Sequence, residues 1–276
     1  TGDYVNARSN LEALAEIAPD NASVHYLLVM SLLQLRINEG IRGKLERVLT
    51  LDPEHVGARV LSIELMIIDG NTSAARENIE ILKKQSGDTV DVFLLEGRLA
   101  SSTGDYKAAV SAYQRALEMK ETNINLLKLE EATWNSGDQA AAIDLLTSWL
   151  VKLPADQASS VRLASRYMAM GKESEAISVY YGMLKQAPDS VPTMNNLAWL
   201  LQDSDPKQAL KFAEKAHLLA PESHKVTDTL AVLVSKNEPS RAQSLIREAL
   251  IASPGNPEYL YHQALIYKRA GNTGEA

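Results

Sequence analysis

Histidine, carboxylate and cysteine side chains supply most metal ligands and acid–base catalysts, but their spacing in this chain does not bring them together. The 5 histidines are scattered, and no pair has the His-Glu-x-x-His spacing of a helical zinc site. Glu130 and Glu131 could form an acid–base pair, but neighbours on a helix point about 100° apart. With 0 cysteines, disulfides and thiolate metal ligands are excluded. The sequence therefore predicts no catalytic site, no metal and no cofactor.

Proline and alanine instead recur with a period of about 34 residues. The proline positions are Pro19, Pro53, Pro154, Pro188, Pro221 and Pro254. Two further positions of the series, near Gly87 and Glu121, have no proline. The residue 12 positions before each member of this series is nearly always alanine. These residues are Ala7, Ile41, Ala75, Ala109, Ala142, Ala176, Ala209 and Ala242, with Ala276 next in the series. A fixed period of this length is typical of arrays of paired helices.

The residue types explain why paired helices would pack at this period. Small residues recur in the first helix of each unit, at Gly97, Ala164, Ala198, Ala231 and Ala264. Together with the periodic alanines of the second helix they allow close approach, and larger residues such as Tyr113 and Leu146 fill the space between units. Glycines such as Gly70, Gly104 and Gly171 are expected to end first helices. At Pro206 and Pro239 proline is expected to stop or restart the helix instead.

The clearest unit runs from Val90 to Glu121 and contains Gly97, Gly104, Asp105, Tyr106, Ala109, Tyr113 and Ala116. This pattern resembles the tetratricopeptide repeat, and further copies run from Gln157 to Pro188 and from Val191 to Pro221. The resemblance implies an all-α, right-handed superhelical solenoid of antiparallel helix pairs, with about 8 repeats in a single domain over 1–276. The expected repeats are 1–21 (partial), 22–55, 56–89, 90–123, 124–156, 157–190, 191–223, 224–256 and 257–276 (partial).

The two ends of the chain each fall inside a predicted unit. The chain begins with the second helix of a unit and stops partway into another second helix, so we expect a segment of a longer array. Open ends of such arrays expose apolar faces, which makes end-to-end self-association possible. No apolar run approaches the roughly 20 residues that span a bilayer, so no transmembrane segment is predicted in this fragment.

Charge and repeat type together define the expected partner. The net charge is −7, and the basic residues form no cluster that would track phosphates, so nucleic acid is not the expected partner. The resemblance instead implies a protein or peptide held in the concave groove that the first helices line. No unit has Lys followed four residues later by Asn, so the clamp that grips the acidic tails of cytosolic chaperones is not expected.

Carrying the groove-facing positions of the repeat onto this sequence gives a set of candidate partner-binding residues. They are Arg98, Asn125, Lys128, Asn195, Trp199, Asp228 and Tyr261. Asn side chains can bond a peptide backbone, and Trp and Arg are enriched at binding hot spots. The alternative is that Trp199 packs between units and that Asn195 caps local structure. Trp134 and Trp149 are predicted to be structural.

A narrower resemblance lies in the C-terminal third, at Asn195 to Trp199, Ala213 to Ala216, Asp228 to Leu230 and Tyr261 to Ala264. These segments resemble bacterial tetratricopeptide lipoproteins linked to exosortase (PEP-CTERM) and exopolysaccharide gene clusters, although Ala231 stands where those proteins often have Gly. The resemblance implies an exported, lipid-anchored protein, periplasmic or outer-membrane-associated in a Gram-negative bacterium.

The sequence as a whole therefore favours a non-catalytic protein-interaction scaffold for envelope protein sorting or exopolysaccharide export. Two alternatives remain open. One is a cytoplasmic adaptor that binds an extended peptide. The other is the non-catalytic arm of a larger enzyme such as a glycosyltransferase, whose catalytic domain would be encoded in the same reading frame.

Overall fold

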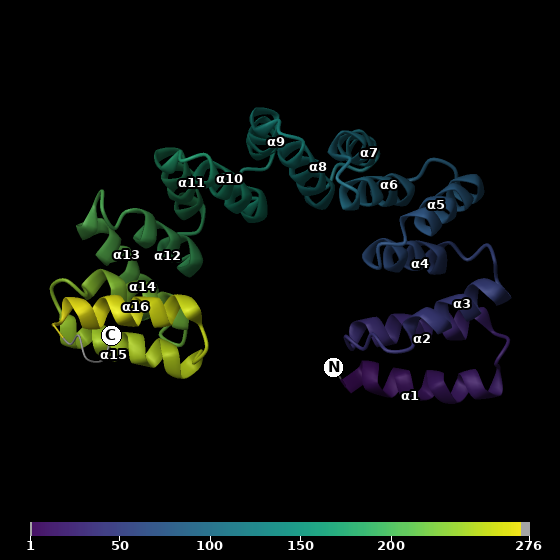
Figure 1. Ribbon diagram of the computed structural model, residues 1–276, viewed down its shortest axis with the longest axis horizontal. Helices are drawn as coiled ribbons and strands as arrows, with labels where there is room; N and C mark the ends of the chain where they lie inside the picture. Colours follow the sequence, from purple (N-terminus) through teal and green to yellow (C-terminus); the bar gives the residue numbers. More distant parts are fainter. Residues whose placement is uncertain (1, 272–276) are drawn as a thin grey trace. The chain divides into compact units, whose positions relative to one another are not determined.

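The computed structural model describes residues 2–271, and these form sixteen α-helices and no strand (Figure 1). The expected positions at Asn272 and Ala276, and the end of the last partial repeat, lie outside the described residues. The helices are α1 Gly2–Ile17, α2 Ala22–Gln34, α3 Ile41–Leu51, α4 Val56–Ile68, α5 Thr72–Ser86, α6 Val90–Ser102, α7 Tyr106–Met119, α8 Asn123–Asn135, α9 Gln139–Lys152, α10 Gln157–Ala169, α11 Glu173–Gln186, α12 Val191–Leu200, α13 Pro206–Leu219, α14 His224–Val234, α15 Pro239–Ala252 and α16 Pro257–Arg269.

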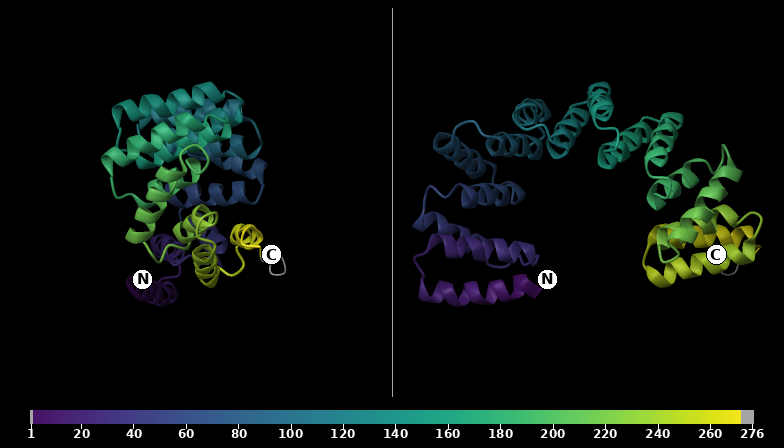
Figure 2. Two further views of the ribbon diagram at one scale, coloured as in Figure 1. Left: turned by 90° about the vertical axis from the view of Figure 1, so that its left-hand side faces the viewer. Right: turned by 180° about the vertical axis from the view of Figure 1, so that it is seen from behind.

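The chain forms two compact units, Thr1–Leu145 and Leu146–Ala276, which divide within α9. Consecutive helices pack as antiparallel neighbours from α1 to α8 in the first unit and from α10 to α16 in the second, as Figure 2 shows for α1 to α4 and for α14 to α16. The even-numbered helices are the first helices of the expected repeats. They also contact one another across repeats, α4 with α6 in the first unit, and α12 with α14 and α14 with α16 in the second. The expected fold class, an all-α solenoid of helix pairs, is confirmed.

Polar caps and left-handed glycines set the ends of the helices. Asn71 and Asp105, for example, each accept a hydrogen bond from a backbone N–H in the first turn of the following helix. Gly104 follows α6 with φ +77°, a conformation that glycine adopts without the steric cost of a Cβ atom. Where the glycine is missing, α13 begins at Pro206 and α15 at Pro239, as predicted for proline in the first helical turn.

The small residues of the repeat lie where the two helices of a pair come closest. The periodic alanines from Ala75 to Ala242 are fully buried, and Ile41 in the same series is 4% exposed. Gly97 on α6 faces the ring of Tyr113 on α7, and a Cβ added there would lie 2.5 to 2.8 Å from three ring atoms. Ala164, Ala198 and Ala231 are fully buried in the first helices, while Ala264 on α16 is only partly buried. The close contacts inferred from residue size are therefore present.

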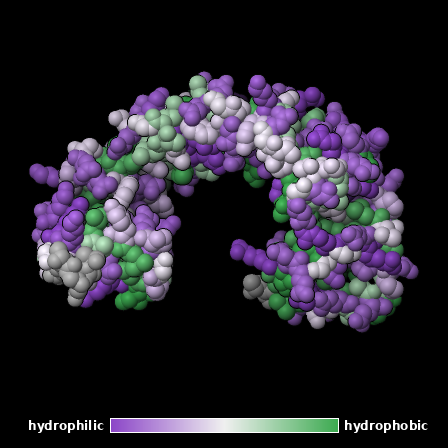
Figure 3. Space-filling model, viewed as in Figure 1, coloured by the Kyte–Doolittle hydropathy of each residue, from purple (hydrophilic) through white to green (hydrophobic). Residues whose placement is uncertain are grey.

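The surface of each unit mixes residue types. Hydrophilic and hydrophobic residues alternate over the visible face in Figure 3. No helix within residues 2–271 combines the length and the apolar character needed to cross a membrane.

Candidate functional site

Four of the seven predicted partner-binding residues come from three first helices of the second unit. Asn195 and Trp199 lie one turn apart on α12, Asp228 lies on α14 and Tyr261 lies on α16. A core that contains Ala198, Leu230 and Ile266 holds these three helices against one another. The repeat therefore places residues that are far apart in sequence on neighbouring helices.

A cleft of about 370 Å³ opens beside these helices. Its polar lining includes Asn195, Trp199, Lys225, Asp228, Glu258 and Tyr259. Trp199 is 38% exposed, so part of its indole surface is accessible to a ligand. Concave sites that combine an aromatic surface with a few convergent polar groups are the usual form of a binding site.

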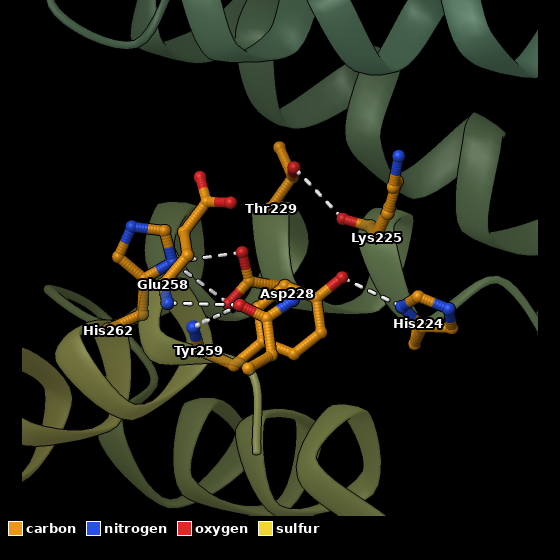
Figure 4. Close-up of polar contacts among 8 residues, drawn as sticks. His224, Lys225, Asp228, Thr229, Glu258, Tyr259 and His262 are labelled. Atoms are coloured by element: carbon orange, nitrogen blue, oxygen red, sulfur yellow. Dashed lines mark hydrogen bonds and ion pairs between the residues drawn. The ribbon is translucent and has the colours of Figure 1, made fainter. Parts of the chain in front are cut away.

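A buried ion pair between α14 and α16 forms one wall of the site. The Nδ1 atom of His262 lies 2.9 Å from both carboxylate oxygens of Asp228, and the two side chains are 5% and 6% exposed (Figure 4). The ring of His262 lies between two aromatic neighbours, with centroids 5.5 Å from Trp199 and 5.9 Å from Tyr261. The pair therefore connects three of the predicted residues, Trp199, Asp228 and Tyr261.

A second polar contact joins the same two helices. The hydroxyl of Tyr259 lies 2.7 Å from Nδ1 of His224, and the Thr229 hydroxyl donates to the Lys225 carbonyl at 3.1 Å (Figure 4). Tyr259 is 2% exposed and belongs to the core behind the cleft. The Tyr259–His224 contact joins α14 to α16 beside the cleft, while the Thr229–Lys225 bond lies within α14.

The carboxylates alter the protonation of their neighbours. The hydrogen bond that His262 donates to Asp228 raises the pKa of His262 above its usual value, against the opposing effect of burial, and the charges of Asp228 and Glu258 add to the increase. The pKa of Tyr259 is raised first by burial and then by the same two charges. Asp228 and Glu258 therefore give this region a negative local field.

The raised pKa of His262 predicts a pH-dependent stability. Because the folded protein holds the proton more tightly than the unfolded chain, the stabilisation is complete below the ordinary histidine pKa near 6.5 and is lost as pH rises through the folded pKa. We expect the free energy of unfolding to fall as the pH rises from about 6.5 through the folded pKa of His262. Chemical denaturation below pH 6.5 and at a series of higher pH values should show a smaller fall in His262→Gln. An equal fall in both proteins would contradict a coupled pair.

The other three predicted residues belong to the first unit. Nη1 of Arg98 on α6 lies 2.9 Å from Oε1 of Glu64 on α4, in a half-exposed ion pair. Nζ of Lys128 lies 5.9 Å from the centre of the Tyr113 ring. Asn125 is 3% exposed, and its amide donates to the carbonyls of Ala116 and Lys120 at 3.4 and 2.9 Å. The amide of Asn125 therefore closes a loop within the chain, whereas Arg98 and Lys128 remain accessible to a partner.

Two further predictions concern tryptophan and metal ligands. Trp149 is buried, and its indole N–H donates to Asp156 at 2.7 Å, in agreement with a structural role. Over residues 2–271, no group of three or more histidine, aspartate or glutamate side chains is arranged to hold a metal ion.

His262, Glu258, Tyr259 and Lys225 were not among the predicted site residues. One signal for His262 was present in the sequence, because it follows Asp228 by 34 residues, which is one repeat. Arg98 follows Glu64 by the same interval, and Arg269 follows Ser235 by the same interval. Complementary polar residues one repeat apart thus indicate contacts between successive first helices.

Comparison with known proteins supports the repeat assignment. Residues 90–123, which contain α6 and α7, match the family model of the tetratricopeptide repeat. The yeast Tom70 crystal structure superimposes with a TM-score of 0.70 over 98% of this chain and 59% of that chain, at 15% identity. The Cut9 and Hcn1 complex of the APC/C gives a TM-score of 0.50 over 95% of this chain and 52% of that chain, at 17% identity. At these identities the likeness shows the fold alone.

Two bacterial relatives are similar in sequence to about half of this chain. A protein of Escherichia coli O157:H7 assigned as cellulose synthase operon protein C is 31% identical over 157 residues, which are 52% of this chain and 13% of that protein. Cellulose synthase operon protein C of Pseudomonas fluorescens (strain SBW25) is 26% identical over 150 residues, which are 54% of this chain and 9% of that protein. The chain therefore corresponds to a small part of the length of both relatives.

Proposed function

We propose that this chain is a non-catalytic protein-interaction scaffold that serves exopolysaccharide export, and that it holds a segment of a partner protein in the α12–α14–α16 cleft. The single observation that carries the proposal is that cleft, where accessible groups from three successive first helices face solvent together. The fold supports an interaction role because stacked helix pairs create extended binding surfaces.

The link to exopolysaccharide has two supports. The two bacterial relatives are named for a cellulose synthase operon. The segments that resemble exopolysaccharide-linked lipoproteins also contain the cleft residues Asn195, Trp199 and Asp228. On these two supports we propose a location in the cell envelope, periplasmic or associated with the outer membrane, and a lipid anchor outside the present sequence.

Affinity capture from envelope and soluble fractions of the native cell tests this function. We expect the wild-type chain to capture a protein of the polysaccharide-export machinery, and Asn195→Ala/Trp199→Ala to capture it at least about tenfold less, because a tryptophan at the centre of a site commonly dominates binding. A matched control, Asn237→Ala/Ile251→Ala, removes an exposed amide and an 81% exposed aliphatic group outside the cleft.

The outcomes separate the alternatives. Equal loss in the cleft variant and in the control would show that the cleft is not the working surface. Capture of a cytosolic protein alone would favour the adaptor function instead of an envelope scaffold. Both variants should retain the wild-type helical circular dichroism spectrum.

A further inference from the structure

One buried acceptor in the cleft has no partner within the chain. Among the described residues, Ser86 Oγ and Asn195 Oδ1 are the buried side-chain polar atoms without a hydrogen bond. Of these two, Asn195 lines the cleft. Buried polar atoms in folded proteins nearly always have a partner, so the unsatisfied Asn195 Oδ1 beside the cleft favours a ligand whose donor bonds it once this side chain turns toward the cleft.

The remaining polar groups of the cleft also favour a ligand that donates hydrogen bonds and carries positive charge. Glu258 is exposed at the cleft and forms no ion pair with another described residue. Asp228 lies beside it and shares its carboxylate with His262 (Figure 4). Among the described residues that line the cleft, Lys225 is the one lysine or arginine. Asp228, Glu258 and Lys225 together give the cleft a charge of −1 while His262 is neutral, and the sum is 0 while His262 is protonated.

The exposed part of Trp199 supplies the apolar surface that a planar cation prefers. Cations bind over the face of tryptophan more strongly than over other aromatic rings. Asn195 lies one turn before Trp199 on α12, so the amide side chain and the indole share one side of that helix. One ligand group could therefore contact both of them.

Taking the cleft as the partner site proposed above, we propose that it recognises an arginine side chain of the partner protein. A guanidinium group is planar and carries five N–H donors, so it can lie on Trp199 while donating to Asn195 Oδ1 and to the Glu258 carboxylate. A lysine ammonium has three donors and cannot stack as a plane. An acidic peptide would meet Glu258 and Asp228 and be repelled. The cleft thus prefers a positively charged ligand, whereas the clamp that grips the acidic tails of cytosolic chaperones prefers a negatively charged one.

Titration of the 276-residue chain with small probes tests this recognition directly. The probe is N-acetyl-arginine amide, and N-acetyl-citrulline amide is its uncharged analogue of nearly the same shape. The readout is the NMR signal of the Trp199 indole N–H, assigned with Trp199→Phe. We expect saturable shifts with the arginine probe and about tenfold weaker binding of the citrulline probe.

Variants locate the site. Glu258→Gln should weaken arginine binding about two- to fivefold, as for an exposed ion pair, whereas the exposed Glu248→Gln on α15 should leave it unchanged.

Raising the pH through the pKa of His262 should strengthen binding of the arginine probe to the wild type, because Asp228 loses its cationic partner. The groups that act on His262 are Asp228 on α14, and Glu258 and Tyr261 on α16, with uncharged Trp199 on α12. The His262→Gln variant should not show this pH effect.

Four results would overturn the inference. Equal binding of the arginine and citrulline probes would show that charge is not recognised, and no change in Glu258→Gln would remove the proposed contact. Saturable binding of chitosan oligosaccharides without binding of the arginine probe would identify an amino sugar as the ligand. If the cleft variant loses its captured protein but the arginine probe neither binds nor competes, the scaffold function stands and the arginine inference fails. If the probe binds but capture does not depend on the cleft, the proposed function fails.

Discussion

Replacing Asp228 with alanine should lower the free energy of unfolding by about 3 kcal/mol. The substitution leaves His262 buried, at 4% exposure, without the carboxylate that lies 2.9 Å from its Nδ1 atom. Removing one member of a buried pair is costly because the remaining polar or charged group is no longer compensated. Urea denaturation followed by circular dichroism measures the loss, and the Trp199 indole signal reports the same change locally.

The ion pair of Arg241 with Glu214 provides a matched control in the same unit. Its atoms lie 2.7 Å apart, but its side chains are 38% and 44% exposed. Glu214→Ala should therefore cost no more than about 1 kcal/mol, since solvent screens exposed pairs. Similar losses for Asp228→Ala and Glu214→Ala would mean that burial does not strengthen the Asp228–His262 pair, which would contradict the account of the site.

Replacing Gly97 with alanine should destabilise the first unit by about 2 kcal/mol, although alanine is the better helix former. The added Cβ would lie 2.5 Å from the nearest atom of the Tyr113 ring, so that ring or the helix must move. Tyr113 is 5% exposed and also packs with Ala109, Leu129 and Ala132, which leaves it little room. Chemical denaturation of Gly97→Ala gives the size of the effect.

Gly43→Ala is the control for that experiment. Gly43 lies within α3, and a Cβ added there meets no atom within 4 Å. This substitution should be neutral or stabilise the protein by up to about 1 kcal/mol, because glycine is the poorer helix former. In the Gly97→Ala background, Tyr113→Leu should recover part of the lost stability. Equal effects of the two glycine substitutions would argue against close packing at Gly97.

The fold could be predicted from the sequence because its determinants are local and repeated. Gly97, Ala109 and Tyr113 occupy fixed places in one unit, and the same residue sizes return about every 34 residues. A single unit would be a weak signal, but the repetition gives each position several independent observations. The division into two compact units at Leu145 was not evident, since the repeat pattern continues through α9 without a composition change.

The site could be predicted only in part, because the partners of a side chain depend on which helices become neighbours. Helical spacing placed Asn195 and Trp199 on one face, and the structure adds Glu258 and Tyr259 from α16 to the same cleft. The scattered histidines gave no functional role to His262, and its pairing with Asp228 required the contact between α14 and α16. Asn125 has the spacing of a groove residue, yet carbonyls at the end of α7 take up its amide.

Hydrogen–deuterium exchange of the chain, with and without its captured partner, tests most directly whether the cleft is the working surface. The account predicts that the partner slows exchange in α12, α14 and the first turns of α16, around Trp199, Asp228 and Glu258. It also predicts that the Asn195→Ala/Trp199→Ala variant loses this protection. Protection confined to the second helices α11, α13 and α15, with α12, α14 and α16 unchanged, would contradict it.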